Sequence, residues 1–536
     1  MANTLSNAAG SIQFDADVLV IGGGPAGAWA ACSAAGNGAR VVLVDKGYCG
    51  SSGATAPSGT GVWYVQPEQA KREAAMASRE ALGGFLADRA WMGRLLDQTY
   101  DNINLLAEWG YPFATNDEGK SQRTSLQGPE YMRLMRKRVR EAGVKILDHS
   151  PALELLVDDE GAVAGAMGVR RQQDESWVVR AKAVVIATGG CAFLSKALGC
   201  NVLTGDGYLM AAEAGADFSS MEFSNAYAIA PAFGSVTKTL FYNWATFTDE
   251  AGTVIPDAAG RHRSVIAKKL LSEKVYAQID RADESVQAAM RMAQPNFFLS
   301  FDRGGINPFT QRFPVTLRLE GTVRGTGGLR ITDQSCATSV PGLYAAGDAA
   351  TRELICGGFT GGGSHNAAWA MSSGFWAGAA AADRARHLGT RTAKRVVTRA
   401  GGVALETRND RPFDPARVTR AVQDEVLPYD KNYFRTGTVL HHSLRQLDLL
   451  WSDIRQADAA APEDVVKARE AAAMTATARW MFRSALVRTE TRGMHKREDY
   501  AKLDTAQRHL LTSGGLDEVW VKTRPAPALA VQEVAA

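Results

Sequence analysis

The sequence predicts an α/β fold in which one doubly wound unit is split by an inserted α+β unit and followed by a helical unit. Three observations predict it. An apolar strand beginning near residue 17 runs into a glycine-rich turn at 22–27 and then a helix, and a second apolar strand follows at 40–45. Strand, helix and strand in this order form a parallel βαβ unit. From about 412 to 487, apolar residues recur near every third or fourth place, as in helices.

The first turn has the spacing G-x-G-x-x-G in Gly22, Gly24 and Gly27. Such glycines allow a tight turn, the approach of a pyrophosphate to the backbone, and close packing of helix on strand. The helix N-terminus then faces the phosphates. Asp45 ends the next strand about 20 residues later, where a carboxylate accepts hydrogen bonds from ribose hydroxyls. The alternative is an ordinary glycine-rich turn, but strand, helix and acid in register favour a bound dinucleotide.

Four further segments favour FAD over NAD as that dinucleotide. A loop of small residues at 46–59 follows Asp45 and leaves backbone amides free to reach phosphate and ring oxygens, where NAD enzymes normally continue with a helix. An apolar strand at 183–187 ends in a glycine turn, and residues 204–207 open a helix. A strand at 342–348 delivers a carboxylate that can hold a ribityl hydroxyl, and it is followed by a glycine-rich run and a long helix.

In this order the segments resemble the flavoprotein subunits of succinate dehydrogenase, fumarate reductase, L-aspartate oxidase and adenylylsulfate reductase, from about residue 15 to 505. The resemblance implies a Rossmann-like FAD-binding domain in two parts, with an inserted capping domain and a C-terminal helical domain. The expected domains are the FAD-binding parts 15–218 and 331–388, the capping domain 219–330, the linker 389–411, and the C-terminal helical domain and tail 412–536.

Within these domains the sequence predicts several elements. A β-rich return is expected at 152–179, with a turn at 158–161, and a polar helical stretch at 263–292 in the capping domain. C-terminal helices are expected at 415–427, 435–458 and 462–486. The motifs and the resemblance imply these FAD-binding residues: Gly22, Gly24, Pro25, Ala26, Gly27, Asp45, Lys46, Ser51, Ser52, Gly53, Ala54, Thr55, Ala152, Ala187, Thr188, Gly189, Thr204, Asp206, Gly347, Asp348, Ser364 and Asn366.

Departures from the family pattern bear on the flavin and on the substrate. Succinate dehydrogenases and fumarate reductases link the flavin covalently to a His where this chain has Gly53, so non-covalent FAD is expected. Counting back from 373–378, Gly357 and Gly361 stand where the dicarboxylate enzymes place a carboxylate-binding His and Arg. Their proton-donating Arg would align near Phe241 or Tyr242. Because a C4-dicarboxylate without its guanidinium clamp would leave buried charge unpaired, fumarate, succinate and aspartate are not expected as substrates.

Substrate-facing residues are expected in the cap and in the loop before the last FAD helix. Arg324 could bind an anionic group or stabilise an oxyanion, or it could simply form a salt bridge with Glu320. His365 could carry a proton, or it could offer only its backbone to the flavin. With Tyr242 from the cap, Arg324 and His365 form the predicted catalytic set. The full set of candidates is Tyr242, Asn243, Trp244, Arg318, Glu320, Arg324, Phe359 and His365, and the aromatic residues of this region are alternatively core.

The C-terminal stretch from Arg488 to Tyr500 resembles the Ser-Arg-Gly-Ala-His-x-Arg-Glu-Asp-Phe motif of the succinate dehydrogenase family. In that family it ties the helical domain back toward the FAD domain. The resemblance therefore implies an inter-domain network of ion pairs in preference to direct catalysis.

Composition excludes several other classes of function. The chain has 60 basic and 57 acidic residues and a formal net charge of +3, so no electrostatic footprint for nucleic acid is present. No leader pattern opens the sequence and no apolar run reaches about 18 residues, so we expect a cytoplasmic protein without an integral membrane segment. The six cysteines lack C-x-x-C spacing and the eight histidines lack H-x-x-x-H spacing, so no metal site is expected. Cys356 is the exception among the cysteines because its loop is expected to border the flavin.

The sequence thus predicts an FAD-dependent oxidoreductase that transfers hydride between a small organic substrate and the flavin. The alternative is the flavin subunit of an electron-transfer complex with a ferredoxin-like iron-sulfur partner. The segment Ser52-Gly53-Ala54 and the cap layout at 221–252 are similar to the adenylylsulfate reductase α-subunit, which favours this alternative.

Overall fold

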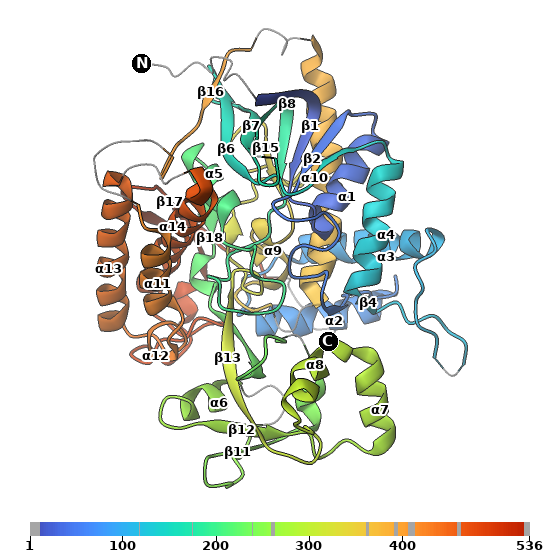
Figure 1. Ribbon diagram of the computed structural model, residues 1–536, viewed down its shortest axis with the longest axis vertical. Coiled ribbons are helices and arrows are strands. Elements are labelled where there is room, and N and C mark those ends of the chain that lie inside the picture. Colours follow the sequence, from blue (N-terminus) through green and yellow to red (C-terminus); the bar gives the residue numbers. More distant parts are fainter. Residues whose placement is uncertain are drawn as a thin grey trace, which may run out of the picture.

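The structure, a computed structural model, describes residues 11–529 apart from 117, 174, 238, 259–262, 361–363, 391–394, 406–412 and 458–461. Its centre is an eight-stranded mixed sheet in the order β16-β6-β7-β8-β1-β2-β5, with β15 also paired to β8. Figure 1 shows this sheet at one end of the molecule, the capping domain at the other, and the C-terminal helices along one side. The predicted α/β class is confirmed.

The parallel core of the sheet is built from the predicted βαβ unit. Strand β1 (Ser11–Ile21) pairs in parallel with β2 (Val41–Val44) on one side and with β8 (Glu175–Ile186) on the other. Strand β5 (Lys145–Leu147) extends it beyond β2, and β15 (Leu343–Ala345) pairs with the end of β8. The segments 18–21, 41–44, 183–186 and 343–345 at the centre of this core are buried, as expected for parallel strands covered on both faces.

Two antiparallel strands form the predicted return. They are β6 (Ala152–Asp158) and β7 (Val163–Arg170), and β7 pairs with β8. A short strand that the sequence did not predict, β16 (Val397–Arg399), adds to the edge beside β6. It lies within the expected linker 389–411, of which residues 391–394 and 406–411 lie outside the described residues.

Helices α1 (Pro25–Gly36) and α10 (Ser364–Leu388) join the two parts of the FAD domain. They cross at small residues: a Cβ on Gly374 would lie 2.3 Å from the Ala26 carbonyl oxygen, and one on Gly378 would lie 2.2 Å from that of Ala30. The other elements of this domain are β3 (Gly59–Gly61), α2 (Gln69–Leu82), α3 (Arg89–Glu108), β4 (Ser125–Gln127), α4 (Gly128–Glu141), α5 (Asp206–Glu213), the 3-10 turn η3 (Gly347–Ala349) and α9 (Glu353–Cys356).

The capping domain is a four-stranded antiparallel sheet with helices packed on it. Its order is β10 (Ala226–Pro231), β13 (Phe313–Gly321), β12 (Val275–Gln278) and β11 (Thr246–Thr248). The expected helical stretch at 263–292 is wrong as one element: α6 (Arg263–Lys269) and α7 (Glu284–Ala293) are separated by β12, whose alternating apolar residues pair with β13. Helix α8 (Pro295–Gly304) and the 3-10 turns η1 (Met221–Phe223) and η2 (Phe241–Trp244) complete the domain.

The C-terminal domain contains the expected helices as α11 (Pro415–Val426), α13 (Gly437–Gln456) and α14 (Val465–Val487), joined by the short α12 (Tyr429–Asn432). The expected end of the second helix, Asp458, lies outside the described residues. The sequence did not predict the hairpin of β17 (His509–Gly514) and β18 (Trp520–Pro525). Strand β17 pairs with β9 (Phe218–Ser219), which pairs with β14 (Gly328–Leu329), so the chain end returns to the junction of cap and FAD domain. No helix in the described part of the chain is long and apolar enough to cross a membrane.

Candidate functional site

One large cleft, with a volume of about 1020 Å³, runs between the FAD domain, the cap and the C-terminal domain. Its walls include the glycine-rich turn after β1, the loop after β2, the end of β8 and the start of α10. The opposite walls come from β10, η2 and α6 of the cap, and from Gly493, Met494 and Lys496. Binding sites for small ligands usually occupy about 300–1,000 Å³, so this cleft has room for a dinucleotide and a small second molecule.

The glycine-rich turn has the geometry that the motif predicts. Gly22 has φ +109, and a Cβ there would lie 2.3 Å from the Ala187 carbonyl oxygen. A Cβ on Gly27 would lie 1.8 Å from the Gly22 carbonyl oxygen, so only glycine permits this contact of helix and strand. Gly24, in contrast, has nothing within 4 Å of the Cβ position. The open side at Gly24 and the N-terminus of α1 therefore leave space and backbone donors for a pyrophosphate.

Asp45 lies buried in the wall of the same cleft, only 4% exposed. Its Oδ2 accepts a hydrogen bond of 2.5 Å from the Gly23 amide, and its Oδ1 accepts bonds from the Gly47 amide and the Ser52 hydroxyl. The carboxylate thus joins the glycine turn to the loop that follows it. Each carboxylate oxygen has two lone pairs, so the group keeps acceptor capacity for a ribose hydroxyl.

Lys46 lines the cleft but its ammonium is already paired. Its Nζ lies 2.7 Å from the Asp206 carboxylate and 2.5 Å from the Glu470 carboxylate, and it donates to the Thr204 hydroxyl at 2.8 Å. These carboxylates raise the pKa of Lys46 above its ordinary value, against the effect of burial. Lys46 therefore ties the FAD domain to helix α14 while its stem lies in the wall of the cleft.

Most of the predicted FAD-binding residues line this cleft, and four do not. The four are Gly27, Ser51, Thr204 and Ser364. Gly27 packs against the Gly22 backbone, and Ser51 is exposed to solvent. The Thr204 hydroxyl accepts a hydrogen bond from Lys46 and donates one to Asp206, and the Ser364 carbonyl oxygen accepts one from the Trp63 amide. Those that line the cleft are Gly22, Gly24, Pro25, Ala26, Asp45, Lys46, Ser52, Gly53, Ala54, Thr55, Ala152, Ala187, Thr188, Gly189, Asp206, Gly347, Asp348 and Asn366.

These residues fit FAD. The glycine cradle, the ribose-binding acid and a second acid at Asp348 stand along one continuous cleft. The Asn366 Oδ1 is buried in its wall without a hydrogen-bond partner among the described residues, so a ligand donor would satisfy it. At Gly53 the Cβ position has nothing within 4 Å, and glycine offers no side chain for a covalent bond to a flavin.

At the cap end of the cleft, Arg324 and Glu320 form an ion pair. The Arg324 Nη1 donates to the Glu320 Oε2 at 3.0 Å, and the Thr237 hydroxyl donates to the Oε1 at 2.6 Å. Glu320 is fully buried, while the Arg324 side chain is 12% exposed. The expected alternative for Arg324, a salt bridge with Glu320, is therefore present. Arg324 still lines the cleft, and the ion pair leaves its other guanidinium nitrogens available to a ligand.

Tyr242 also lines the cleft, from η2. Its side chain is 6% exposed, and its hydroxyl is buried without a hydrogen-bond partner among the described residues. Burial raises the pKa of this phenol above its ordinary value, so it stays protonated at neutral pH. Tyr242 can thus donate a hydrogen bond to a bound molecule, but it is a poor acid for releasing a proton.

His365 does not line the cleft, contrary to its predicted catalytic role. Its ring is fully buried 4.6 Å from the Trp63 ring, and its Nδ1 bonds the Thr360 carbonyl oxygen at 2.9 Å. Burial and nearby arginines lower the pKa of His365 to about 3, so the ring is neutral. Its neighbour Asn366 faces the cleft instead, because successive helical residues point about 100° apart. His365 is therefore not retained as a proton carrier.

The loop before α10 borders the cleft, but neither Cys356 nor Gly357 lines it. Cys356 is fully buried, its thiol donates to the Arg352 carbonyl oxygen, and it does not line the cleft, so it is not beside the flavin site. A Cβ on Gly357 would lie 2.5 Å from the Gly83 carbonyl oxygen, so this position packs on the backbone and cannot be the place of a ligand-binding side chain. Gly361 lies outside the described residues. The loop reaches the cleft through Phe359 and Thr360, neither of which is charged.

The other substrate-facing candidates are divided. Asn243 lines the cleft. Arg318 does not, because its guanidinium donates to the Gly234 and Ser195 carbonyl oxygens within the molecule. Trp244 likewise lies outside the lining and packs against the core.

Sequence reasoning missed two cationic residues of the cleft. Arg263, the first residue of α6, and Lys496, in the C-terminal loop, both line it. Lys496 stands between His495 and Arg497 in the motif that was predicted to form ion pairs. The residues on either side of Lys496 match the family motif, in which the position of Lys496 is variable. Only the position of Lys496 in the folded chain shows that it lines the cleft.

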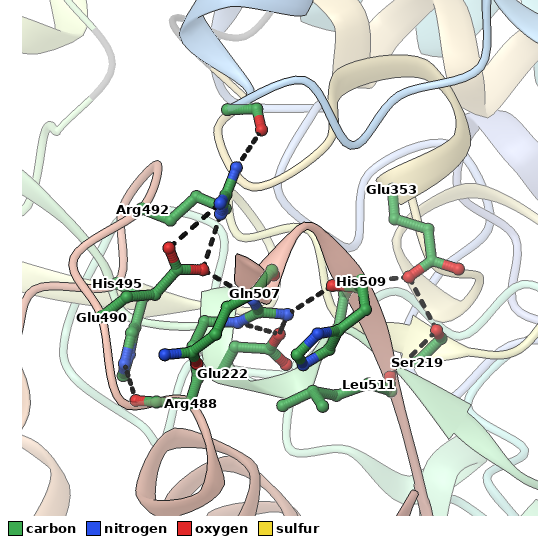
Figure 2. Close-up of polar contacts among 12 residues, drawn as sticks. Ser219, Glu222, Glu353, Arg488, Glu490, Arg492, His495, Gln507, His509 and Leu511 are labelled. Carbon is green, nitrogen blue, oxygen red and sulfur yellow. Dashed lines mark hydrogen bonds and ion pairs between the residues drawn. The ribbon is translucent and has the colours of Figure 1, made fainter. Parts of the chain in front are cut away.

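The C-terminal motif does form the expected network, which Figure 2 shows. Arg488, fully buried, contacts Glu222 of η1 at 2.8 Å and Glu490 at 2.9 Å, and Arg492 contacts Glu490 at 2.6 Å. Arg492 also donates to the Gly84 carbonyl oxygen of the FAD domain. Because breaking one partner of a buried pair costs about 3–5 kcal/mol, this network fixes the C-terminal loop against both other domains.

Comparison with known proteins agrees with an FAD-binding chain. The FAD binding domain model matches residues 17–231, and the fumarate reductase flavoprotein C-terminal model matches residues 424–528. The chain is 28% identical to L-aspartate oxidase of Streptomyces coelicolor, over 92% of this chain and 91% of that protein. It is 25% identical to a chain of the fumarate reductase (CoM/CoB) of Methanothermobacter marburgensis, over 91% of this chain and 95% of that protein.

Solved structures share the whole fold. The E. coli quinol fumarate reductase FrdA chain superposes with a TM-score of 0.81 at 20% identity, covering 97% of this chain and 98% of that one. Adenylylsulfate reductase of Archaeoglobus fulgidus superposes with a TM-score of 0.77 at 19% identity, covering 99% of each chain. Since the two matched domains together span more than half of the sequence, the chain belongs to the FAD-dependent oxidoreductase family of fumarate reductase, succinate dehydrogenase and L-aspartate oxidase flavoproteins.

Proposed function

We propose that this protein transfers hydride between non-covalently bound FAD and a small organic acid held at the cap end of the cleft. One observation carries the proposal: a single cavity of about 1020 Å³ is lined by the glycine turn and Asp45 at one end and by Arg324 and Tyr242 at the other. A cofactor and a substrate in one cavity can meet without leaving the protein. FAD, when bound, supplies the hydride acceptor or donor.

The residues of the chain would bind and orient the substrate. The Arg324 guanidinium, held by Glu320, would pair with negative charge that is present in the substrate or develops during reaction. The neutral Tyr242 hydroxyl would donate a hydrogen bond to the same molecule. The cap, closing over the cleft, would exclude water. The proton-transferring group is not His365.

A C4-dicarboxylate is not the substrate in this proposal. The described residues of the loop before α10 that reach the cleft, Phe359 and Thr360, carry no charge to clamp a second carboxylate. The cationic residues Arg263, Arg324 and Lys496 come from the cap and the C-terminal loop, so a second carboxylate that lay against the loop before α10 would have no cation beside it. A buried carboxylate without a cation costs several kcal/mol.

The test is an anaerobic mixing experiment with FAD-loaded protein. Reduced enzyme is mixed with unsaturated and keto organic acids, and oxidised enzyme with saturated and hydroxy acids, while flavin absorbance is followed. We expect at least one acid to change the flavin redox state in a saturable way, and its uncharged amide to fail. A flavin that reacts with no acid, or equally well with amides, would contradict the proposal.

A second candidate is a flavin subunit that passes electrons to an iron-sulfur protein. It is supported by the names of relatives, since two of them are named as single subunits of fumarate reductases. In the described part of the chain, no group of three or more His, Cys, Asp or Glu side chains could hold a metal ion. Copurification of a cysteine-rich partner with the tagged protein, and flavin reoxidation by that partner, would favour this candidate.

A further inference from the structure

Five apolar and aromatic side chains of the cap line the cleft, and we call them the apolar wall. They are Tyr227 and Ile229 of β10, Leu240 just before η2, and Phe241 and Tyr242 within η2. Tyr227 and Ile229 are two residues apart on one strand, so they lie on the same face of the cap sheet. The residues that fit FAD belong to the FAD domain, so the apolar wall remains available to a second molecule.

Tyr227 offers carbon surface to a ligand because its hydroxyl is already used. The hydroxyl donates to the carbonyl oxygens of Val426, at 2.9 Å, and Leu427, at 3.1 Å. Its ring packs edge-to-face on the ring of Tyr433, which also lines the cleft, with 5.5 Å between the ring centres. Such a pair holds both rings in place. The part of the Tyr227 side chain that is left for a ligand is therefore its ring.

Tyr242 carries a polar group of the apolar wall that has no partner. Its ring packs against Phe247 and Phe297, with 6.0 Å and 6.1 Å between the ring centres. The hydroxyl is buried without a hydrogen-bond partner among the described residues. Burial alone raises the pKa of Tyr242, with no nearby charge contributing, so its surroundings are apolar. A hydrogen-bond acceptor on a ligand would satisfy this hydroxyl.

Leu240 brings the apolar wall to the surface of the molecule. Its side chain is 74% exposed, whereas its neighbours Phe241 and Tyr242 are 7% and 6% exposed. A single exposed leucine is ordinary on a protein surface. Here the exposed leucine continues a buried apolar surface into the open part of a cleft, which is typical of a ligand-binding groove. A ligand that lay on the wall would cover Leu240.

We propose that the apolar wall binds a bulky apolar group of the substrate, about the size of a six-membered ring, and that the Tyr242 hydroxyl donates a hydrogen bond to an acceptor beside that group. The inference rests on the proposed function and narrows its substrate to organic acids with a ring or a branched apolar body. Arg324 would then meet a different part of the same molecule. A ring that is buried on the wall strengthens binding about tenfold or more.

The test is titration calorimetry of FAD-loaded protein with acetamide, benzamide and cyclohexanecarboxamide. The three probes share one uncharged amide, so they differ only in the apolar body and the cations of the cleft favour none of them. We expect both ring amides to bind at least about tenfold more tightly than acetamide. Tighter binding of benzamide identifies a planar ring as the preferred body, and tighter binding of cyclohexanecarboxamide identifies a non-planar one.

Variants of the wall locate the binding. Ile229→Thr and Leu240→Ser should each weaken binding of the ring amides about threefold or more and leave that of acetamide unchanged. Because Leu240 is exposed, its variant keeps the test valid if Ile229→Thr does not fold. Tyr242→Phe should weaken binding of all three amides without lowering Tm, since the hydroxyl has no partner in the described part of the chain to lose.

Matched controls come from the same domain. Leu299→Ser changes an exposed leucine of α8, and Val315→Thr changes a buried residue of β13, both outside the cleft. Both should bind the probes like wild type. Ring amides that bind no more tightly than acetamide, or wall variants that bind them like the controls, would overturn the proposal.

Failure of the wall and failure of the proposed function give different results. If ring amides bind at the wall but no organic acid changes the redox state of the flavin, the proposed function fails and the wall stands. If a short acid reacts with the flavin as fast as its ring-bearing homologue, the wall does not select the substrate and the proposed function stands.

Discussion

The Arg324 guanidinium donates a 3.0 Å hydrogen bond to the Glu320 carboxylate, and both side chains line the cap end of the cleft. The carboxylate is fully buried and also accepts from Thr237. Glu320 therefore fixes the direction in which the Arg324 guanidinium points. An arginine oriented in this way is suited to planar, two-point recognition of an oxyanion.

Arg324→Lys keeps the charge but loses the fork. If bidentate contact with the substrate matters, the rate of flavin reduction or reoxidation should fall by roughly ten- to a hundredfold, or about 1.4–2.7 kcal/mol. Stopped-flow absorbance with the active organic acid measures the rate, and FAD content is measured on the same sample. Arg318→Lys, a cap arginine outside the cleft, is the control. A wild-type rate in Arg324→Lys would reduce Arg324 to a structural partner of Glu320.

Asp45→Ala should weaken FAD binding. The substitution removes an acceptor for ribose hydroxyls, and it also releases the Gly23 and Gly47 amides that Asp45 holds. Loss of charged hydrogen bonds predicts a cost of about 1–3 kcal/mol in FAD affinity. Fluorescence titration of the apoprotein with FAD measures it. Asp17→Ala, in the preceding strand but outside the cleft, should bind FAD normally, and an unchanged affinity in Asp45→Ala would remove this carboxylate from the site.

The cofactor end of the site follows from sequence more fully than the substrate end. Gly22, Gly24 and Asp45 act through local geometry, because the turn and the strand that position them lie within one βαβ unit. Arg263 and Lys496 meet in one cleft although more than two hundred residues separate them, and no spacing in the chain encodes that contact. His365 was misassigned for a different reason. Adjacent residues of α10 face different ways, His365 toward the core and Asn366 toward the cleft, and the sequence at the start of the helix does not show which of the two faces the cleft.

The same distinction applies to the fold. Helices α11, α13 and α14 were predicted to within a few residues because their apolar periodicity is long and regular. Strand β16 and the β17–β18 hairpin were missed because each is short and obtains its stability from a partner strand distant in sequence. The break between α6 and α7 was missed because β12 is only four residues long.

Reduced enzyme should not be reoxidised by fumarate at an ordinary enzymatic rate, about 1 per second or more. The reason is that Phe359 and Thr360 provide no cation for a carboxylate that lies against the loop before α10, whereas the cations of the cleft come from the cap and the C-terminal loop. Anaerobic stopped-flow reoxidation is the measurement, with oxygen as the positive control for flavin reactivity. Saturable reoxidation by fumarate above that rate would restore the C4-dicarboxylates as substrates.

Asp499→Asn should reduce stability in a way that depends on pH. The hydrogen bonds from Arg497, with that from the Gly437 amide, lower the pKa of Asp499 to about 2. A depressed carboxyl pKa stabilises the folded state above the unfolded pKa of about 3.9, and this contribution is lost as pH falls toward 2. Because the side chain is 35% exposed, solvent screening limits the expected loss at pH 7 to about 1 kcal/mol. Urea unfolding at several pH values measures it.

The control for Asp499→Asn is Glu518→Gln, which removes an exposed acid of the β17–β18 turn. It should change the free energy of unfolding little at any pH. A difference between wild type and Asp499→Asn that persists undiminished at pH 2 would show that the ion pair is not its cause.

The central claim is that the cleft holds FAD without a covalent bond, and acid precipitation tests it most directly. Purified protein is quantified for flavin by absorbance, precipitated with trichloroacetic acid, and the pellet and supernatant are separated. Since Gly53 stands where the covalent members have the linking His, the account predicts about one FAD per chain, all of it in the supernatant. Yellow colour that stays with the pellet, or purified protein that neither contains nor binds FAD, would contradict the account.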